Sequence, residues 1–443
     1  MMIGANLLAR LFHLRRSSFL RSAATLSGGQ FVATAISFGF APILSRLYAP
    51  QDYGVLATYM SIAVILSALA NLQMARALVA EADEEQAHAL LGLSLLLAFG
   101  FSALTLAGVL LLRAGGIQGL DDLGVWLLLL PATVLASGTG AALLGWANRH
   151  HRYRLMSGYQ ILNVLVSSGG ALLLAWGGYG ARGLMTGYFL GQLAAFLWVW
   201  IGNRDAIAGL RGLSWARMRA AGHAHRNYAL WTTPTSMIEQ VSSASPVLVL
   251  SLWGNMLAIV GHYNRARGLL MLPVGILGGA IGQVFFRRGA QDMARAGHCR
   301  PLFWKLVAGM TAISAPTFLL LALIAPQLFV FVLGPQWSEA GHIARILAPV
   351  MALQLIVMPA SKVLWLYHRQ RLDFFLSILF AVVTTVAVAS VAFLGFAPEI
   401  AIDVFAGAQI LLYLVYLGSS ILIVERDHRS RRGQSAEAAA VKP

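Results

Sequence analysis

The chain has little charge, and few of its charges are acidic. Only 11% of its 443 residues are charged, and 17 Asp and Glu stand against 32 Lys and Arg, which gives a net charge of +15. In soluble domains about a quarter of the residues are charged. Because 58% of the residues are hydrophobic and the mean hydropathy is +0.72, the composition excludes an ordinary soluble domain and indicates an integral membrane protein.

Several chemistries lack the residues they need. Cys299 is the single cysteine, so the chain forms no intrachain disulfide, and nothing indicates a thiolate site. The sequence contains no Walker-type glycine loop, so direct ATP hydrolysis is not supported. Two histidine pairs, His150 with His151 and His223 with His225, lie in basic segments without matching carboxylates or cysteines. We therefore expect no metal site and no bound cofactor.

What the chain does contain is a series of long apolar runs. A helix needs roughly 20 apolar residues to cross a bilayer, and only helices or closed barrels satisfy their backbone there. Twelve such runs predict an all-α polytopic membrane protein. Their approximate ranges are 23–45, 54–72, 90–112, 125–146, 158–176, 183–201, 228–252, 259–286, 303–324, 343–366, 372–394 and 402–424.

The basic residues alternate with these runs. Most Lys and Arg lie at the N-terminus, in every second gap and in the C-terminal tail, whereas only Arg46, Arg113 and Arg182 lie in the opposite gaps. Because basic segments stay on the cytoplasmic side, both termini are predicted to be cytoplasmic. The basicity thus has a topological explanation, and we expect contact with anionic lipids rather than with nucleic acid.

The longest gap on this side divides the runs into two sets of six. We predict four parts, namely an N-lobe at 1–201, a basic cytoplasmic linker at 202–227, a C-lobe at 228–424 and a disordered basic tail at 425–443. The linker contains apolar residues at an approximately helical spacing, namely Ile207, Leu210, Leu213 and Met218. Two interpretations of it stay open: an amphipathic segment on the membrane surface, or a solvated loop.

The two lobes resemble one another. APILSRLYAPQDYG from Ala41 is echoed by SPVLVLSLWGNMLAIVG from Ser245, and LGWANRHHRYRLMSGYQIL from Leu144 by VLWLYHRQRLDFFLSIL from Val363. Each lobe begins with a span that runs outward, so the repeat is parallel, as in some transporters, and a cavity between the lobes is the expected substrate site. The gaps on the outer side are short, which argues against an enzyme with a large external catalytic loop.

Three longer stretches carry a family resemblance. They are LSRLYAPQDYGVLATYMS from Leu44, IVGHYNRARGLLMLPVGILGGAIGQVFFRR from Ile259 and LGPQWSEAGHIARILAPVMALQLIVMPAS from Leu333. Together they resemble the Wzx-type polysaccharide transporters, oligosaccharide flippases of the MOP superfamily, which also contains the MATE exporters and the lipid II flippase MurJ. The resemblance covers essentially the whole chain and implies a MATE/MOP-like fold of about twelve helices in two six-helix lobes.

The resemblance also implies a function. The cargo would be an undecaprenyl-diphosphate-linked oligosaccharide, moved across a bacterial inner membrane by alternating access for O-antigen, capsule or exopolysaccharide biosynthesis. The chain would not be an enzyme, and its partners would include a polysaccharide polymerase and a chain-length regulator. One alternative is a MATE-like, cation-coupled exporter of small molecules, and another is a membrane enzyme of polysaccharide assembly. Basic residues outnumber carboxylates within the spans, which favours an anionic cargo.

Glu239 is a carboxylate deep in a predicted span. It follows Tyr228 by eleven residues, so at about 1.5 Å per residue it lies roughly 17 Å into a hydrocarbon core of about 30 Å. A carboxyl group at that depth needs water or a partner. We predict a cavity residue that pairs with a basic group or couples transport to H⁺ or Na⁺; the alternative is a structural ion pair.

Arg265 and Arg267 lie in the eighth span. Two residues apart on a helix correspond to about 200° of rotation, so both side chains cannot point into one cavity. The planar guanidinium group suits phosphate oxygens, and one of the two is a candidate ligand of the pyrophosphate. The alternative is an interfacial arginine whose charge reaches the headgroups.

Three further residues complete the candidate binding set. Lys362 lies near the cytoplasmic end of the tenth span and is a candidate substrate ligand, or else reaches the headgroups. Gln30 is a polar group inside the first span. Tyr263, like Tyr228, is a candidate surface for stacking on sugars, although aromatic residues near span ends are also typical of the membrane interface.

Overall fold

The computed structural model describes residues 18–115, 121–254, 256–397 and 400–440. In this part of the chain every regular element is helical, and no strand occurs. The chain forms two compact units, Met1–Gln240 and Val241–Pro443, and the boundary between them lies inside one helix, α11 (Thr233–Gly254). The prediction of an all-α polytopic membrane protein is confirmed.

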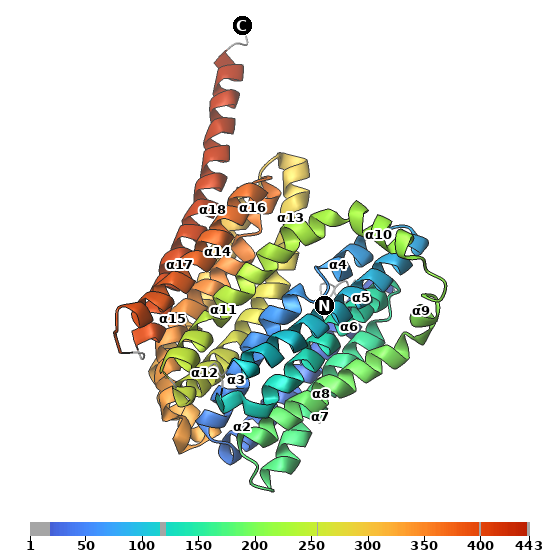
Figure 1. The fold of residues 1–443 in the computed structure, drawn as a ribbon. Coiled ribbons are helices and arrows are strands. Elements are labelled where there is room, and N and C mark those ends of the chain that lie inside the picture. The colour runs from blue at the N-terminus through green and yellow to red at the C-terminus, as the bar shows by residue number, and fades with distance from the viewer. Residues whose placement is uncertain (1–17, 116–120, 255, 398–399, 441–443) are drawn as a thin grey trace, which may run out of the picture. The chain divides into compact units, whose positions relative to one another are not determined.

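The first unit is built from helices that follow the predicted spans. Its elements are α2 (Ser18–Leu47), α3 (Pro50–Leu69), α4 (Met74–Ala80), α5 (Glu84–Ala114), η1 (Asp121–Leu129), α6 (Leu130–Arg149), α7 (Tyr153–Ala175), α8 (Ala181–Gly202), α9 (Arg204–Ala208), α10 (Trp215–Ala224), η2 (Tyr228–Thr232) and the start of α11. Residues that favour the start of a helix occur at several of these N-termini. Pro50 opens α3, and the Asp83 side chain accepts the Glu85 backbone N–H at 3.1 Å to cap α5. α7 packs beside α8 and α2, and α5 beside α6 (Figure 1).

The second unit is arranged around a buried helix. After the rest of α11, its elements are α12 (Leu257–Pro273), η3 (Val274–Gly278), α13 (Gly279–Ala296), α14 (Arg300–Leu333), η4 (Pro335–Trp337), α15 (Ser338–Ala360), α16 (Val363–Leu366), α17 (Gln370–Phe393) and α18 (Ile400–Ala440). α15 packs against α12, α14 and α18. It therefore forms the core of the unit.

Eleven helices in the described part of the chain are long and apolar enough to cross a membrane. They correspond to eleven of the twelve predicted spans. The exception is the predicted span 228–252, which is helical as η2 and α11 but contains Glu239, Gln240 and several serines. Its low hydropathy follows from these polar residues, and they make it the polar helix of the site described below.

The segment predicted as a linker, 202–227, belongs to the first unit. It forms α9 and α10, and its residues Leu210, Leu213 and Met218 pack on α5 around Gly92 and Leu93. A methyl group added at Gly92 would lie 3.1 Å from the Met218 sulfur atom, so the packing is close. The apolar stripe thus packs on protein and is half-buried there.

The C-terminal segment differs from its prediction. We predicted a disordered tail over 425–443, whereas α18 continues as a helix to Ala440. Glu425, at the start of this segment, accepts hydrogen bonds from Arg300 at 2.8 Å and from the Trp304 indole at 2.9 Å. These contacts hold the helix against α14 just beyond the predicted end of the last span.

The second pair of matching stretches folds into the same turn in each unit. α6 and α16 are each followed by a left-handed histidine, His151 or His368, both with φ near 55°. The next residue, Arg152 or Arg369, donates its backbone N–H to the carbonyl five residues earlier, at 2.8 and 2.7 Å. This pattern is a Schellman motif, which satisfies the last carbonyls of a helix. Both turns have the sequence His-Arg-x-Arg-Leu.

Candidate functional site

α11 brings buried hydroxyl groups into the second unit. Ser242 and Ser245 are buried, and the Ser242 hydroxyl lies 2.8 Å from that of Thr384 on α17. Thr384 is fully buried. Because buried polar groups are costly unless they are hydrogen-bonded, this pair fixes how α11 packs on α17.

Pro246 removes one hydrogen bond from the middle of α11. Proline has no N–H, so the carbonyl of Ser242, four residues earlier, lacks its helical donor. The hydroxyl of Ser245 donates to this carbonyl at 2.9 Å. A side chain therefore supplies the hydrogen bond that the backbone cannot make.

Arg267 of α12 contacts the same turn of α11. Its Nη1 donates to the carbonyl oxygen of Ser243 at 3.3 Å, and its Nη2 to the Ser243 hydroxyl at 3.1 Å. The side chain is half-buried, and among the described residues no carboxylate lies within ion-pair distance of its guanidinium group. Arg267 is thus a fixed cation on a membrane-spanning helix, held by neutral acceptors.

Arg265 contacts a different element. Its guanidinium carbon lies 5.9 Å from the ring centroid of Trp337 in η4, and the His262 ring meets the same indole edge-on at 5.4 Å. Trp337 is fully buried. The rotation of about 200° between the two arginine positions explains why one reaches η4 and the other α11.

Tyr263 and Lys362 also make aromatic contacts within the second unit. The Tyr263 ring is fully buried and lies edge-on to Phe405 of α18, with 6.2 Å between centroids. Its hydroxyl has no hydrogen-bond partner in the described part of the chain. The Lys362 ammonium lies 5.0 Å from the Trp365 ring centroid. Stacking of a sugar on Tyr263 would require the ring to leave this buried position.

The other two predicted site residues lie in the first unit. Gln30 is exposed on α2, and Glu239 is exposed on α11. Glu239 precedes Ser243 by one helical turn, so the two residues share a face of α11. Of the six predicted residues, the structure thus places Tyr263, Arg265 and Arg267 together on α12 and the remaining three on other elements.

A chain of polar side chains in the first unit was not predicted as a group. The Asn163 amide donates to Gln192 at 3.1 Å, and the Gln192 amide donates to the Tyr188 hydroxyl at 3.0 Å. The Tyr188 ring meets the Tyr59 ring edge-on, and the Tyr59 hydroxyl lies 2.6 Å from that of Thr133. The sequence signal was present in Tyr59, which lies in the middle of α3, away from the span ends where tyrosines of the interface occur.

Metal-binding side chains do not gather in the described residues. No group of three or more His, Cys, Asp or Glu there could hold a metal ion. The turn of α11 that Arg267 contacts offers a guanidinium group and hydroxyl groups, and these suit phosphate oxygens and sugar hydroxyls.

Comparisons with known proteins agree with this architecture. A model of the polysaccharide biosynthesis protein family matches residues 43–342, more than half of the chain. Among curated proteins, none matches the chain in sequence. The structure is similar to the lipid II flippase MurJ in an inward closed conformation, with a TM-score of 0.70 and 13% identity over 89% of this chain and 87% of that one.

Two transporters of the MATE family are similar as well. A multidrug resistance MATE transporter of the MOP superfamily, inward-facing, has a TM-score of 0.58 and 14% identity over 89% of this chain and 98% of its own. The MATE transporter ClbM in complex with Rb⁺ has a TM-score of 0.52 and 16% identity over 91% and 94%. At such identities the likeness establishes the fold. The family resemblance seen in the sequence is confirmed: the chain belongs to the polysaccharide biosynthesis protein family and has the fold of MurJ and the MATE transporters.

Proposed function

We propose that the chain flips an undecaprenyl-diphosphate-linked oligosaccharide across the bacterial inner membrane by alternating access, with both termini in the cytoplasm. Membership of a polysaccharide biosynthesis family and a fold shared with a lipid flippase support this proposal. The cargo leaves chemically unchanged, so the chain acts as a transporter and not as an enzyme. A polysaccharide polymerase and a chain-length regulator are the partners that would use its product.

The observation that carries the proposal is the state of Arg267. Its guanidinium group is half-buried in a spanning helix and is held by a backbone carbonyl and a hydroxyl, without a carboxylate among the described residues. A buried cation is costly unless an anion compensates it. A pyrophosphate supplies that anion, and its oxygens match the planar donor fork of arginine.

The polyisoprenoid tail of such a cargo can stay in lipid, so the protein needs to hold only the pyrophosphate and the glycan. The hydroxyl and amide groups of both units can bind sugar hydroxyls. Glu239 supplies a carboxylate on the same helix face as Ser243, the residue that Arg267 holds. We assign to Glu239 the uptake of H⁺ or Na⁺ that returns the empty transporter.

The test uses purified protein in proteoliposomes with a short-chain lipid-diphosphate oligosaccharide. Arg267→Ala should lower the transfer rate about tenfold to a hundredfold, because a hydrogen bond to a charged group contributes roughly 1.5–3 kcal/mol. Arg267→Lys should give an intermediate rate, because it keeps the charge and loses the fork. Arg182→Ala, at an exposed arginine of α8, is the matched control and should transfer at the wild-type rate.

Three results would contradict the proposal. The first is an unchanged rate in Arg267→Ala protein that is present at the wild-type level. The second is a chemically altered lipid, which would indicate an enzyme. The third is transport of cationic small molecules with no transfer of the lipid, which would indicate a MATE-like exporter.

A further inference from the structure

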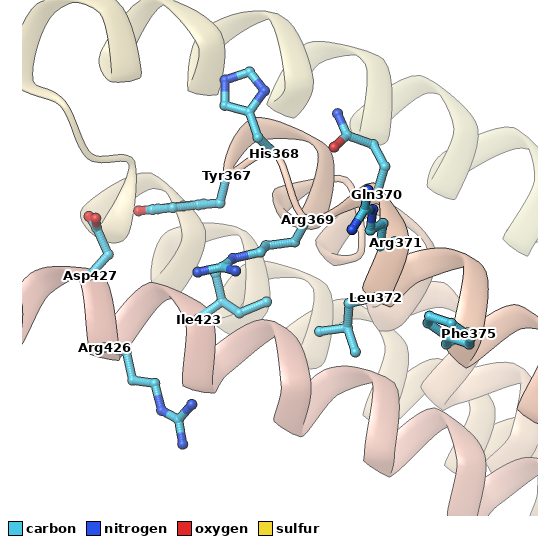
Figure 2. A pocket seen from close by; sticks show the side chains of 10 residues that line it. All are labelled: Tyr367, His368, Arg369, Gln370, Arg371, Leu372, Phe375, Ile423, Arg426 and Asp427. Carbon is cyan, nitrogen blue, oxygen red and sulfur yellow. The ribbon is translucent and has the colours of Figure 1, made fainter.

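A basic pocket opens at one end of the second unit. It has a volume of about 880 Å³ and lies between the turn that joins α16 to α17 and the facing part of α18. Figure 2 shows the side chains that line it: Tyr367 to Leu372 and Phe375 from the turn and α17, and Ile423, Arg426 and Asp427 from α18. The charge pattern of the sequence predicts that this end of the unit is cytoplasmic.

The pocket collects arginine residues that form no ion pair with any residue that the structure describes. Arg369, Arg371 and Arg426 line it and are exposed, whereas Asp427 is the one carboxylate among its lining residues that the structure describes. Within the described residues, none of the three guanidinium groups makes an ion pair or a side-chain hydrogen bond. The pocket therefore has an excess of positive charge that no part of the described chain neutralises.

In the matching turn of the first unit, the arginine has a carboxylate partner. In that turn Arg152, the counterpart of Arg369, forms an ion pair with Asp205 and also donates to the Gly202 carbonyl at 2.9 Å. Arg300, which like Arg426 lies beside the end of the last span, is likewise paired, with Glu425. The first arginine of the same His-Arg-x-Arg-Leu turn is thus paired with a carboxylate in one unit, and in the other it has no such partner among the described residues.

The surface next to the pocket is apolar. Phe375, which lines the pocket, is 65% exposed, and it begins a stripe along α17 that continues through Leu379, Val382 and Val386, which are 43%, 50% and 59% exposed. Their spacing places them on one face of the helix. On α18, Leu422 and Leu411 are 56% and 60% exposed. The pocket therefore offers a ligand positively charged side chains at one end and apolar faces of α17 and α18 beside it.

We propose that this pocket binds the phosphate of an anionic phospholipid of the cytoplasmic leaflet, with the acyl chains lying along the exposed faces of α17 and α18. Arginine forks match phosphate oxygens, and basic pockets between spanning helices suit anionic headgroups. The apolar stripes distinguish this ligand from a free phosphate ion, which would gain nothing from them. The site is separate from Arg267 and makes no assumption about the cargo.

The test measures binding of phosphatidylglycerol by the full-length protein in detergent, from lipid-dependent melting temperatures and from lipid retained in native mass spectrometry. The triple substitution Arg369→Gln, Arg371→Gln and Arg426→Gln should raise the apparent dissociation constant tenfold or more, which is about the effect expected for the loss of several basic residues at a lipid headgroup. Its melting temperature without added lipid should match the wild type, because these side chains are exposed and make no ion pair or side-chain hydrogen bond within the described residues.

The matched control removes the same charge from the other unit. Arg154, Arg211 and Arg219 are exposed arginines of the first unit, and their replacement by Gln should leave phosphatidylglycerol binding unchanged. Phosphatidylcholine, which has no net charge, and glycerol 3-phosphate, which has no acyl chains, should each bind at least about tenfold more weakly than phosphatidylglycerol. Phe375→Ser should weaken binding of phosphatidylglycerol but not that of glycerol 3-phosphate.

Three outcomes would overturn the proposal. Equal loss of binding in both triple variants would show a general effect of net charge. Equal binding of glycerol 3-phosphate and phosphatidylglycerol would show a site for soluble anions. Displacement of phosphatidylglycerol by an undecaprenyl diphosphate at a much lower concentration would show that the pocket receives the cargo lipid.

Discussion

Arg267 donates hydrogen bonds to both the backbone carbonyl and the side-chain hydroxyl of Ser243. Ser243 lies about one turn before Pro246 in α11, and this proline has no N–H to donate to the helix. The contact joins α12 to α11 at the turn where the helical hydrogen bonds of α11 are interrupted. A phosphate that attracts the guanidinium group would loosen this junction. The proposed function therefore predicts that binding of an anion is coupled to the packing of α11 through the side chain of Arg267.

Ser243→Ala should weaken this junction without removing the charge. The variant loses the 3.1 Å hydrogen bond to the hydroxyl and keeps the bond to the carbonyl. We expect transfer in proteoliposomes to fall severalfold, less than in Arg267→Ala, because one neutral hydrogen bond contributes roughly 0.5–1.5 kcal/mol. If Arg267 instead acts through its charge alone, Ser243→Ala will transfer at the wild-type rate.

Ser245 and Pro246 should be energetically coupled. Ser245→Ala leaves the buried Ser242 carbonyl without a donor, so the melting temperature should fall by an amount that corresponds to roughly 1–3 kcal/mol. In a Pro246→Ala background the restored N–H can serve that carbonyl, and Ser245→Ala should then cost much less. A double-mutant cycle measures the difference, and additive effects would contradict the assigned role of Ser245.

Arg345 should be coupled to a second proline in the same manner. Its Nε donates to the backbone carbonyl of Ala322 at 3.0 Å. The helical donor for this carbonyl would be the N–H of residue 326 in α14, but Pro326 has no N–H. We expect Arg345→Ala to lower the melting temperature in the wild type and to have little effect in Pro326→Ala. An equal loss of melting temperature in both backgrounds would contradict the assigned role of Arg345 and would indicate that it acts at the membrane interface.

Asp205 should make stability depend on pH. Its hydrogen bond from Arg152 is the main cause that lowers the pKa of Asp205 from 3.8 to about 2 in the folded chain. A carboxyl group whose folded pKa is depressed stabilises the protein above its unfolded pKa, and the stabilisation is lost as the pH falls through the folded pKa. Asp205→Asn should therefore lower the melting temperature at pH 7, by a small amount because the pair is exposed, and the difference from wild type should vanish as the pH falls from about 4 towards 2.

The control for this pH dependence is in the other unit. Arg369 occupies the matching turn and has no carboxylate partner among the described residues. Arg369→Gln should leave the melting temperature unchanged at both ends of the pH range, as measured in phosphatidylcholine. A pH-dependent effect there would show that the two turns do not differ in pairing.

Most of the spanning helices could be predicted because each one leaves a long apolar signal that needs no tertiary information. α11 was also predicted, within the range 228–252, although its serines and Glu239 give it a lower hydropathy than the other spans have. The separation of Arg265 from Arg267 follows from helix geometry alone. Their partners Trp337 and Ser243 do not, because they depend on how η4 and α11 pack on α12.

The segment 202–227 and the basic turn after α16 show a second limit of prediction from the sequence, which is that it does not identify the surfaces that pack on a segment. Helical spacing in 202–227 was visible, but the surface that covers its apolar residues is α5, more than 100 residues earlier in the chain. The basic residues after α16 were interpreted only as a topology signal. Their lack of carboxylate partners depends on which side chains of α18 face them, and the sequence does not show that.

The π-helical turn η3 joins α12 to α13. Val274–Gly278 follows Pro273 directly, and such a turn carries one residue more than an α-helical turn does. In an uninterrupted α-helix an extra residue would rotate everything after it by about 100°, and the wider π turn takes up this rotation, so the side chains of α13 keep the directions they would have without the extra residue. Deleting one residue within η3 would restore a continuous α-helix in which α13 keeps its direction relative to α12, so the extra residue changes the helix only at the turn that contains it.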